Sequence, residues 1–279
     1  MPELPEVETI KRTLKNNLIG KKIKNVEILE PKQFSGEINQ VISQTIVDIV
    51  RKGKVLSLKL SNNLYLSIHL KLSGQILFSS DRNNAVYPNT IPRADTNKMP
   101  AATTRIIIDF DDNSALFFND MRKFGWMKVL TDIESVSVDV LSPTFTQEYL
   151  SSVLTKTKKP IKTVLMDQTY IAGLGNIYAN DSLWEAKINP LRKCNTLSDD
   201  EIGNLHNAIM KIIKEALSYK GSSAKDELYI IPDGSKGQYQ NYFKVYHQHN
   251  KPCPRCGDII VYVKQAGRSS FYCPTCQKM

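Results

Sequence analysis

The sequence of 279 residues contains no apolar run that approaches the ~20 residues needed to cross a membrane. No signal-peptide pattern precedes Pro2, and neither an internal repeat nor a low-complexity tract is present. These absences argue against a membrane protein, and we expect a cytoplasmic one. Only five cysteines occur, and in a cytoplasmic chain they favour metal ligands or free thiols over disulfides.

Composition describes a globular chain with a basic surface. Apolar residues make up 41% of the chain, and the length allows two domains, each with its own core. The formal net charge of +9 favours a polyanionic partner such as nucleic acid. Charge alone does not separate DNA from RNA, or either from simple solubility.

The first half of the chain has the pattern of a β-sandwich behind one helix. After Pro5, apolar residues recur at helical spacing, and from Lys22 to about Val129 the pattern is of strands. The segments 55–60 and 64–70 alternate with period two around a turn at Asn62-Asn63. Residues 79–104 are polar and proline-rich, so we expect a long loop there.

The second half has helical periodicity. Residues 131–146 have the character of a linker, and helical patterns then continue to about Tyr219. Ser198 and Glu201 form a capping box at the start of an amphipathic helix. The chain is therefore predicted to be an α+β protein with more than one domain.

Four cysteines near the C-terminus have the spacing of a zinc ribbon. Cys253 and Cys256 form one pair, Cys273 and Cys276 form another, and 16 residues separate the pairs. Four thiolates complete a tetrahedral shell, so one zinc ion would have a structural role. The fifth cysteine, Cys194, is expected to be an ordinary thiol.

The first nine residues carry a possible nucleophile. Removal of Met1 would leave Pro2 with a secondary amine whose pKa is near ~8, and an amine that attacks an aldehyde carbon forms a Schiff base. Glu3 and Glu6 lie within one turn and could move protons. On the residues alone, these carboxylates could equally well only complement the helix macrodipole.

The segment Pro2–Thr9 resembles the N-terminus of the bacterial formamidopyrimidine-DNA glycosylases, the 8-oxoguanine repair enzymes. Leu4 favours this group over the related endonuclease VIII enzymes, which typically have glycine there. The likeness recurs down to Lys278. It implies the following domains: a β-sandwich catalytic domain (1–130), a linker (131–146), a helix–two-turn–helix domain (147–220), a lesion-recognition loop region (221–245) and a zinc finger (246–279).

The resemblance also implies roles for residues outside the N-terminus. Lys54 matches a lysine near the lesion, and His69 matches a phosphate-contacting histidine. Asp167–Tyr178 resembles the helix–two-turn–helix motif, in which Asn176 binds phosphate and Lys162 faces the same backbone. Arg268, between the cysteine pairs, matches the arginine that binds phosphates flanking the damaged nucleotide.

The family fills the space left by an extruded base with side chains from two loops. Here Arg122 would bond the orphaned partner base and Phe124 would wedge between bases, while Leu72 stands in the position of the usual methionine. Lys123 replaces a common arginine and should still contact phosphate.

Three further places depart from the family pattern. Asp181 stands where glutamate is usual, and Thr103–Arg105 stands where a His-x-His pair is frequent. The loop Lys220–Glu227 lacks one glycine and has Lys225 in place of arginine. Base preference is accordingly the least constrained property.

The resemblance implies a monomeric DNA glycosylase with AP lyase activity that binds damaged double-stranded DNA in a cleft between its domains. Pro2 would attack C1′, Glu3 would manage protons with support from Glu6, and β,δ-elimination would follow. Two alternatives remain open: the same fold acting on oxidised pyrimidines, and a non-catalytic protein that binds damaged DNA.

Overall fold

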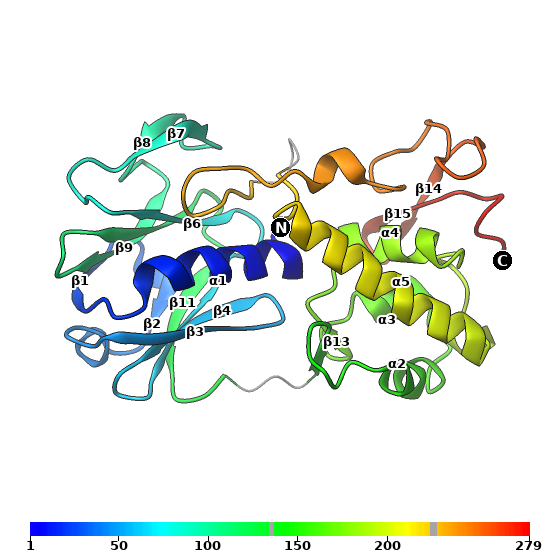
Figure 1. Cartoon of the computed structure of the whole chain (residues 1–279), viewed down its shortest axis with the longest axis horizontal. Helices are drawn as coiled ribbons and strands as arrows, with labels where there is room; N and C mark the ends of the chain where they lie inside the picture. The colour runs from blue at the N-terminus through cyan, green and yellow to red at the C-terminus, as the bar shows by residue number, and fades with distance from the viewer. Residues whose placement is uncertain (134–136, 224–227) are drawn as a thin grey trace. The chain divides into compact units, whose positions relative to one another are not determined.

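A computed structural model of the chain describes residues 1–133, 137–223 and 228–279 (Figure 1). The chain divides into two compact units. Unit 1 holds residues 1–134 together with 219–240, and unit 2 holds residues 135–218 together with 241–279. Within the described residues, no helix is both long enough and apolar enough to cross a membrane.

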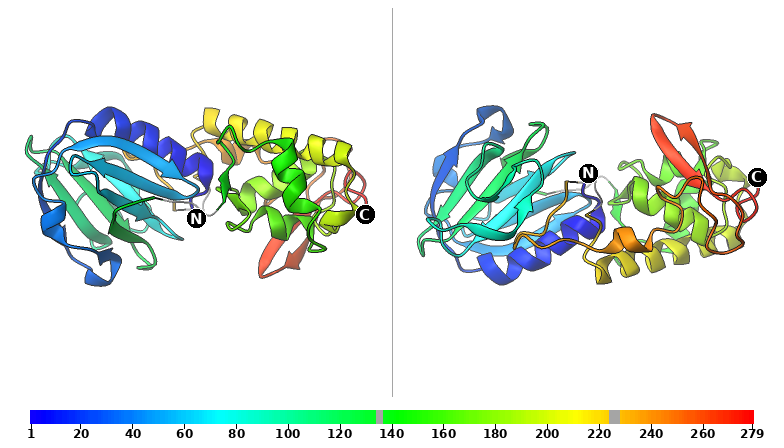
Figure 2. Two further views of the ribbon diagram at one scale, coloured as in Figure 1. Left: turned by 90° about the horizontal axis from the view of Figure 1, so that it is seen from below. Right: turned by 90° about the horizontal axis from the view of Figure 1, so that it is seen from above.

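Unit 1 is a β-sandwich, as the sequence predicts, with α1 (Leu4–Leu18) packed against β3 and β4 of the second sheet (Figure 2). The first sheet is antiparallel and has the order β1 (Ile23–Ile28), β9 (Thr104–Phe110), β10 (Ala115–Asp120), β6 (Gly74–Ser79). The second has the order β2 (Phe34–Ser35), β11 (Trp126–Leu130), β5 (Tyr65–His69), β4 (Val55–Leu60), β3 (Ile46–Lys52), and only its β2–β11 pair is parallel.

The main core of unit 1 lies between the two sheets and under α1. The apolar stripe of α1 supplies Val7, Ile10 and Leu14, and the alternating strands β4 and β5 supply Leu58 and Leu66. All five side chains are at most 1% exposed. Helical spacing on α1 and period-two alternation on the strands therefore direct these side chains into one core.

The prediction of a long loop over residues 79–104 was wrong. This segment contains two short strands, β7 (Val86–Ile91) and β8 (Thr96–Lys98), which pair antiparallel. Their apolar side chains cover a second cluster on the other face of the first sheet, with Ile107 and Phe117 at its base. Strands β9 and β10 carry consecutive apolar residues, so both faces of that sheet must be covered.

Unit 2 combines helices with a short hairpin. Its helices are α2 (Gln147–Leu154), α3 (Ile161–Leu165), α4 (Asn176–Glu185) and α5 (Asp199–Ser218). Its hairpin is β14 (Val261–Gln265) with β15 (Arg268–Tyr272), and two-residue strands β12 (Val138–Asp139) and β13 (Ile171–Ala172) pair beside the helices. The predicted capping box of α5 is confirmed: the amide of Glu201 lies 3.2 Å from Ser198 Oγ, and the amide of Ser198 lies 2.9 Å from Glu201 Oε2.

The segment after α5 returns to unit 1. Tyr229 and Ile231 are buried in the main core, and Ile230 is buried in the second cluster. The amide of Phe78 on β6 donates to the carbonyl of Pro232 at 2.8 Å. Residues 228–232 are therefore an integral part of the sandwich, although the sequence pattern suggested a separate loop region.

Candidate functional site

The start of α1 is held by a reciprocal capping box. Glu3 is the N-cap residue, and its side chain accepts from the backbone of Glu6, while Glu6 Oε2 accepts from the amide of Glu3 at 2.8 Å. Glu6 is completely buried and Glu3 is 3% exposed. Pro2 is buried directly before this cap, and Met1 precedes it. The structure thus places Pro2, Glu3 and Glu6 together.

The second oxygen of Glu6 contacts the returning segment. The amide of Ser222 donates to Glu6 Oε1 at 2.8 Å. Gly221 has φ +75°, and a Cβ there would lie 2.6 Å from Glu6 Oε1, so glycine permits this close approach. Residues 224–227, which include Lys225, lie outside the described part of the chain.

Lys54 lies in the tight turn between β3 and β4 and is 7% exposed. Arg51 links that turn to α1, because its Nε donates to Glu8 Oε2 at 3.0 Å and its Nη1 donates to the carbonyl of Gly53 at 2.7 Å. Burial pushes the pKa of Glu8 upward, but hydrogen bonds from Arg51 and Lys11 outweigh it and lower the pKa. Sequence reasoning missed this Glu8–Arg51 pair, which positions Lys54.

His69 at the end of β5 is held as a neutral imidazole. Burial first, and then the positive charges of Lys71 and Lys54, lower the pKa of His69 to about 4. Its Nδ1 accepts from the amide of Lys71 at 2.9 Å, so the ring proton is on Nε2. Nε2 is therefore a hydrogen-bond donor at neutral pH, which suits a phosphate oxygen.

The predicted wedge residues lie on two exposed loops of unit 1. The side chains of Leu72 and Phe124 are 39% and 51% exposed. The guanidinium of Arg122 lies 5.0 Å from the centre of the Phe124 ring. Lys123 has φ +57° and forms an ion pair with Glu30. Exposed apolar side chains beside cations can interact with both bases and phosphates.

A buried carboxylate that sequence reasoning missed holds both loops. Asp120 Oδ2 accepts from the amide of Gly125 at 2.7 Å and from Gln33 Nε2 at 2.9 Å. Its Oδ1 accepts from the amide of Arg122 at 3.2 Å and from the hydroxyl of Ser73. Asp120 is fully buried, so these donors compensate its charge. The sequence feature that could have indicated this role is the position of a carboxylate just before the wedge residues.

The segment Thr103–Arg105, which departs from the family pattern, supports the same loops. Arg105 Nε donates to the carbonyl of Asp120 at 2.9 Å. The hydroxyl of Thr104 donates to Asn119 Oδ1 at 2.8 Å. These residues therefore fix the end of β10, from which the Arg122–Phe124 loop begins.

In unit 2, Asn176 is the first residue of α4. The preceding turn is fixed by Gln168, whose Nε2 donates to the carbonyl of Leu174 at 2.7 Å and whose Oε1 accepts from the amide of Gly173 at 3.0 Å. Asn180, one turn along α4, accepts from the amide of Phe271 at 2.8 Å and so attaches the hairpin to the helix. The helix start therefore has the geometry of an anion site beside the hairpin.

Lys162 lies on α3, the helix before that turn, and bonds to the hairpin. Its side chain is 2% exposed, and Nζ donates to the carbonyl of Ser269 at 2.7 Å and to Ser270 Oγ at 2.9 Å. The ammonium thus holds the hairpin in position, and the expected contact with the DNA backbone stays a prediction. Arg268, by contrast, is exposed at the start of β15.

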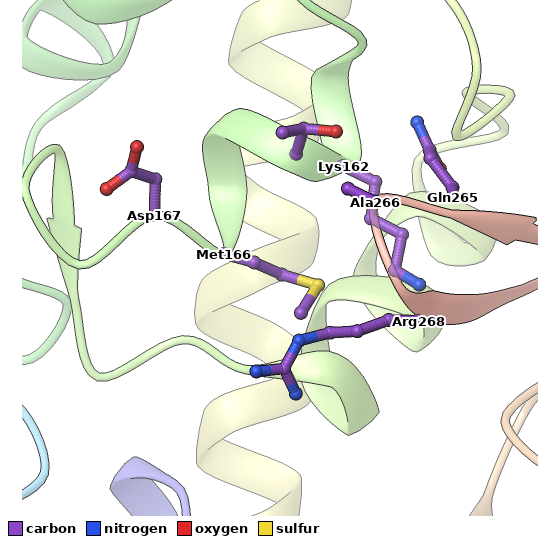
Figure 3. Close-up of a pocket in the computed structure, with 7 residues that line it drawn as sticks. Lys162, Met166, Asp167, Gln265, Ala266 and Arg268 are labelled. Atoms are coloured by element: carbon purple, nitrogen blue, oxygen red, sulfur yellow. The ribbon is translucent and has the colours of Figure 1, made fainter.

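Figure 3 shows Lys162 and Arg268 in one pocket of about 160 Å³. The Arg268 side chain extends beside Met166, and Asp167 points away from it. The pocket is lined by Lys162, Thr163, Met166, Asp167, Gln265, Ala266 and Arg268. Its size and its exposed guanidinium suit a phosphate group rather than a base.

The four predicted zinc ligands form one cluster. Sγ atoms of Cys253 and Cys276 are 4.0 Å apart, those of Cys256 and Cys273 are 3.4 Å apart, and all four lie within 4.8 Å of one another. Zinc–sulfur bonds of about 2.3 Å give a tetrahedron with edges of about 3.8 Å, so the cluster fits the ion.

Cys253 and Cys194 have different surroundings. Trp184 Nε1 donates to Cys253 Sγ at 3.3 Å, which fixes that sulfur from α4. The fifth cysteine, Cys194, lies outside the cluster, where it is buried, and burial raises the pKa of its thiol to about 11. It is the ordinary core thiol that the sequence suggested.

Asp181 holds the start of the zinc-binding segment. It is fully buried, and its carboxylate accepts from the amides of Lys244 at 3.2 Å, Val245 at 3.0 Å and Tyr246 at 3.1 Å. Burial raises its pKa to about 6, and the three amides act in the opposite direction. The departure from glutamate therefore occurs at a structural position.

A β-sandwich with Pro2 directly before a buried helix cap, a helix–two-turn–helix unit and a four-thiolate hairpin together define a class of DNA repair glycosylases. Residues 1–127 match the formamidopyrimidine-DNA glycosylase N-terminal domain, residues 136–227 match the H2TH domain of the same enzymes, and residues 250–278 match the zinc finger found in FPG and IleRS. The chain belongs to the formamidopyrimidine-DNA glycosylase family.

Relatives and solved structures agree over the full length. The formamidopyrimidine-DNA glycosylase of Pelotomaculum thermopropionicum is 40% identical, with all of both chains covered. The MutM (Fpg) protein of Thermus thermophilus is 29% identical with a TM-score of 0.86, covering 99% of this chain and 98% of that one. A Lactococcus lactis Fpg mutant in complex with Fapy-dG-containing DNA is 30% identical with a TM-score of 0.85, covering all of both chains.

We predict that one zinc ion binds per chain and stabilises unit 2 alone. Cys253→Ser should abolish stoichiometric zinc and lower the melting temperature of unit 2, because metal-binding free energy contributes directly to folding of such sites. Unit 1, which contains none of the ligands, should melt unchanged. Metal analysis and differential scanning calorimetry measure both effects.

Cys194→Ala is the matched control, since that thiol is buried outside the cluster and should leave the zinc content unchanged. Active protein that contains no zinc would contradict the prediction.

Proposed function

We propose that this chain is a bifunctional DNA glycosylase and AP lyase of base excision repair that removes oxidised purines from double-stranded DNA. It would act as a monomer in the cytoplasm. The observation that carries the proposal is the buried capping box at the start of α1, which puts two carboxylates directly beside Pro2. DNA binding alone would need no free amine beside these two carboxylates, and removal of Met1 would expose one at Pro2.

The reaction begins once Met1 has been removed. The Pro2 nitrogen attacks C1′ of the damaged nucleotide, the glycosidic bond breaks, and the base leaves with a proton. The nitrogen loses its proton, the C1′–O4′ bond of the sugar ring breaks with a proton added to O4′, and the nitrogen lone pair forms a positively charged iminium that acidifies the C2′ proton. Glu3 transfers protons at the deoxyribose, and Glu6 fixes Glu3 in place. Successive β- and δ-eliminations then cleave the strand on both sides.

The remaining site residues bind the strand. Lys54 and His69 contact phosphate near the lesion from unit 1, and His69 does so as a neutral donor. Asn176 and Arg268 contact phosphate from unit 2, while Lys162 positions the hairpin that carries Arg268. Zinc, when bound by the four cysteines, supplies rigidity to that hairpin and takes no part in the chemistry.

Three side chains replace the extruded nucleotide. Phe124 and Leu72 enter the stack, and Arg122 bonds the orphaned base. Leucine is apolar and close to methionine in volume, so the substitution at position 72 retains the wedge. Lys123 contacts phosphate at the edge of the same loop.

The competing substrate class is oxidised pyrimidines. One solved relative, the wild-type Lactococcus lactis Fpg, was crystallised with DNA containing an oxidised pyrimidine, at 32% identity to this chain. Leu4 argues for purines here: it is completely buried at the start of α1, in the place where the pyrimidine-specific group has glycine. Oxidised pyrimidines are therefore the alternative substrate class.

The lesion preference is tested on a panel of duplexes that each carry one damaged base. We expect efficient cleavage of 8-oxoguanine or formamidopyrimidine opposite cytosine and poor cleavage opposite adenine, because Arg122 donates to cytosine and meets a donor on adenine. Efficient excision of thymine glycol with neither purine lesion processed would transfer the assignment to the pyrimidine-specific group.

The wedge is tested by Phe124→Ala. Loss of one aromatic stack should slow excision of 8-oxoguanine from duplex DNA by about tenfold. Cleavage at a preformed abasic site should fall much less, because an abasic nucleotide needs less unstacking. Met121→Ala is the control, since Met121 is a comparably exposed neighbour outside the wedge. Equal losses on the two substrates would indicate a general binding defect instead.

The nucleophile is tested by borohydride trapping. Sodium borohydride should reduce the iminium to a stable protein–DNA adduct, which peptide mapping should place on Pro2. A residue retained before Pro2 should abolish trapping and leave lesion binding largely intact. The Lys54→Ala variant should still form the trapped adduct with abasic DNA. A lysine amine has a pKa near ~10.4 and is therefore a poorer nucleophile at neutral pH than the Pro2 amine. An adduct on Lys54 would overturn the mechanism.

A further inference from the structure

The outer face of the β14–β15 hairpin carries a pocket that the proposed reaction does not use. Its volume is about 360 Å³, within the range of small-ligand sites. The lining side chains are aromatic, basic or hydroxylic, and none is acidic: His247, His249, Tyr262, Lys264, Ser269 and Phe271. In Figure 2 the hairpin projects from the helices of unit 2.

The two faces of the hairpin differ because side chains alternate along its strands. Ser270, on the inner face, is completely buried and bonds to Lys162. The outer face has the cross-strand pairs Tyr262–Phe271 and Lys264–Ser269. Arg268 lines the smaller pocket with Lys162, so the outer face is separate from the predicted phosphate contact.

Tyr262 and Phe271 form an aromatic platform on the outer face, and His249 and His247 lie along its edge. Tyr262 and Phe271 have centroids 5.9 Å apart and are tilted by 34°. His249 meets Tyr262 edge-on at 5.2 Å. His247, at φ +54°, is stacked on Tyr246 at 4.3 Å. The loop before Cys253 thus places two imidazoles against the strand face.

Exposure distinguishes this platform from ordinary core packing. Phe271 is 5% exposed and forms the floor, whereas Tyr262 is 47% exposed. An aromatic ring half open to water, with a lysine two residues along the same strand face, presents a flat apolar surface beside a cation. Single-strand-binding surfaces use this combination, because every base has a π-face and every nucleotide a phosphate.

We propose that the outer face of the hairpin binds an unpaired nucleotide of single-stranded DNA. The base stacks on Tyr262, and its phosphate lies against Lys264 with the imidazole of His249 at the edge. The site is indifferent to damage, because stacking on Tyr262 uses the π-face that every base has. It would hold an unpaired nucleotide apart from the reacting one.

The test uses the full-length protein with zinc and a fluorescein-labelled oligothymidylate of ~10 nucleotides, a length within the range one small domain binds. Fluorescence anisotropy measures the affinity. Tyr262→Ala should weaken binding about fivefold or more, and Tyr262→Phe should restore it, because phenylalanine keeps the ring. Equal affinity of wild type and Tyr262→Ala would overturn the proposal.

The charge contribution is tested separately. Lys264→Ser should reduce the slope of log affinity against log salt by about 0.7, the value for one phosphate contact on a single strand. Lys251→Ser removes the same charge from an exposed lysine of the same zinc finger outside the pocket, and should leave the slope unchanged. Equal slope changes in both variants would mean that only general charge attraction is involved.

Stacking has a spectroscopic signature. A 2-aminopurine base placed within the oligonucleotide should be quenched on binding wild type and Tyr262→Phe, and not on binding Tyr262→Ala. Cleavage of lesion-containing duplex should be the same in all these variants, which separates this site from the proposed reaction. Tighter binding of oligouridylate than of oligothymidylate would overturn the assignment to DNA.

Discussion

One buried carboxylate connects two parts of unit 1 that are far apart in the sequence. Glu6 accepts from the amide of Glu3 at one oxygen and from the amide of Ser222, 216 residues away, at the other. A carboxylate buried this completely is stable only with such partners. The same contact that caps α1 beside Pro2 therefore also fixes the segment that returns from unit 2, and the position of each depends on the other.

Local patterns in the sequence predicted much of this architecture. Three of these patterns depend on residues that are close in the sequence, and the structure contains each of them. They are the apolar stripe of α1, the alternation of β4 and β5, and the Ser198–Glu201 capping box. The cysteine cluster belongs to the same group, since two short loops set its geometry. Such features can be predicted from the sequence because the residues that interact are close together in the chain, so their spacing indicates the interaction.

Long-range contacts could not be read in this way. Polarity suggested a loop for the stretch that forms β7 and β8, because the apolar face it covers belongs to strands distant in the sequence. No role was predicted for Asp120 or Asp181, yet each accepts from several amides in the interior. The ammonium of Lys162 bonds a carbonyl 107 residues away, a contact that its sequence neighbours do not indicate. The type of a charged residue shows whether it can donate or accept hydrogen bonds, but only the fold determines which partner it contacts.

The discontinuity of unit 1 has a consequence for synthesis on the ribosome. Its main core includes Tyr229 and Ile231, which the ribosome adds roughly a hundred residues after the last strand of the sandwich. At ~5–20 residues per second, the first sheets would wait about 5–20 s with part of their apolar surface uncovered. Unit 2 is also interrupted, because residues 241–279 emerge last. Each folded part is therefore completed only after a segment of the other part has been synthesised.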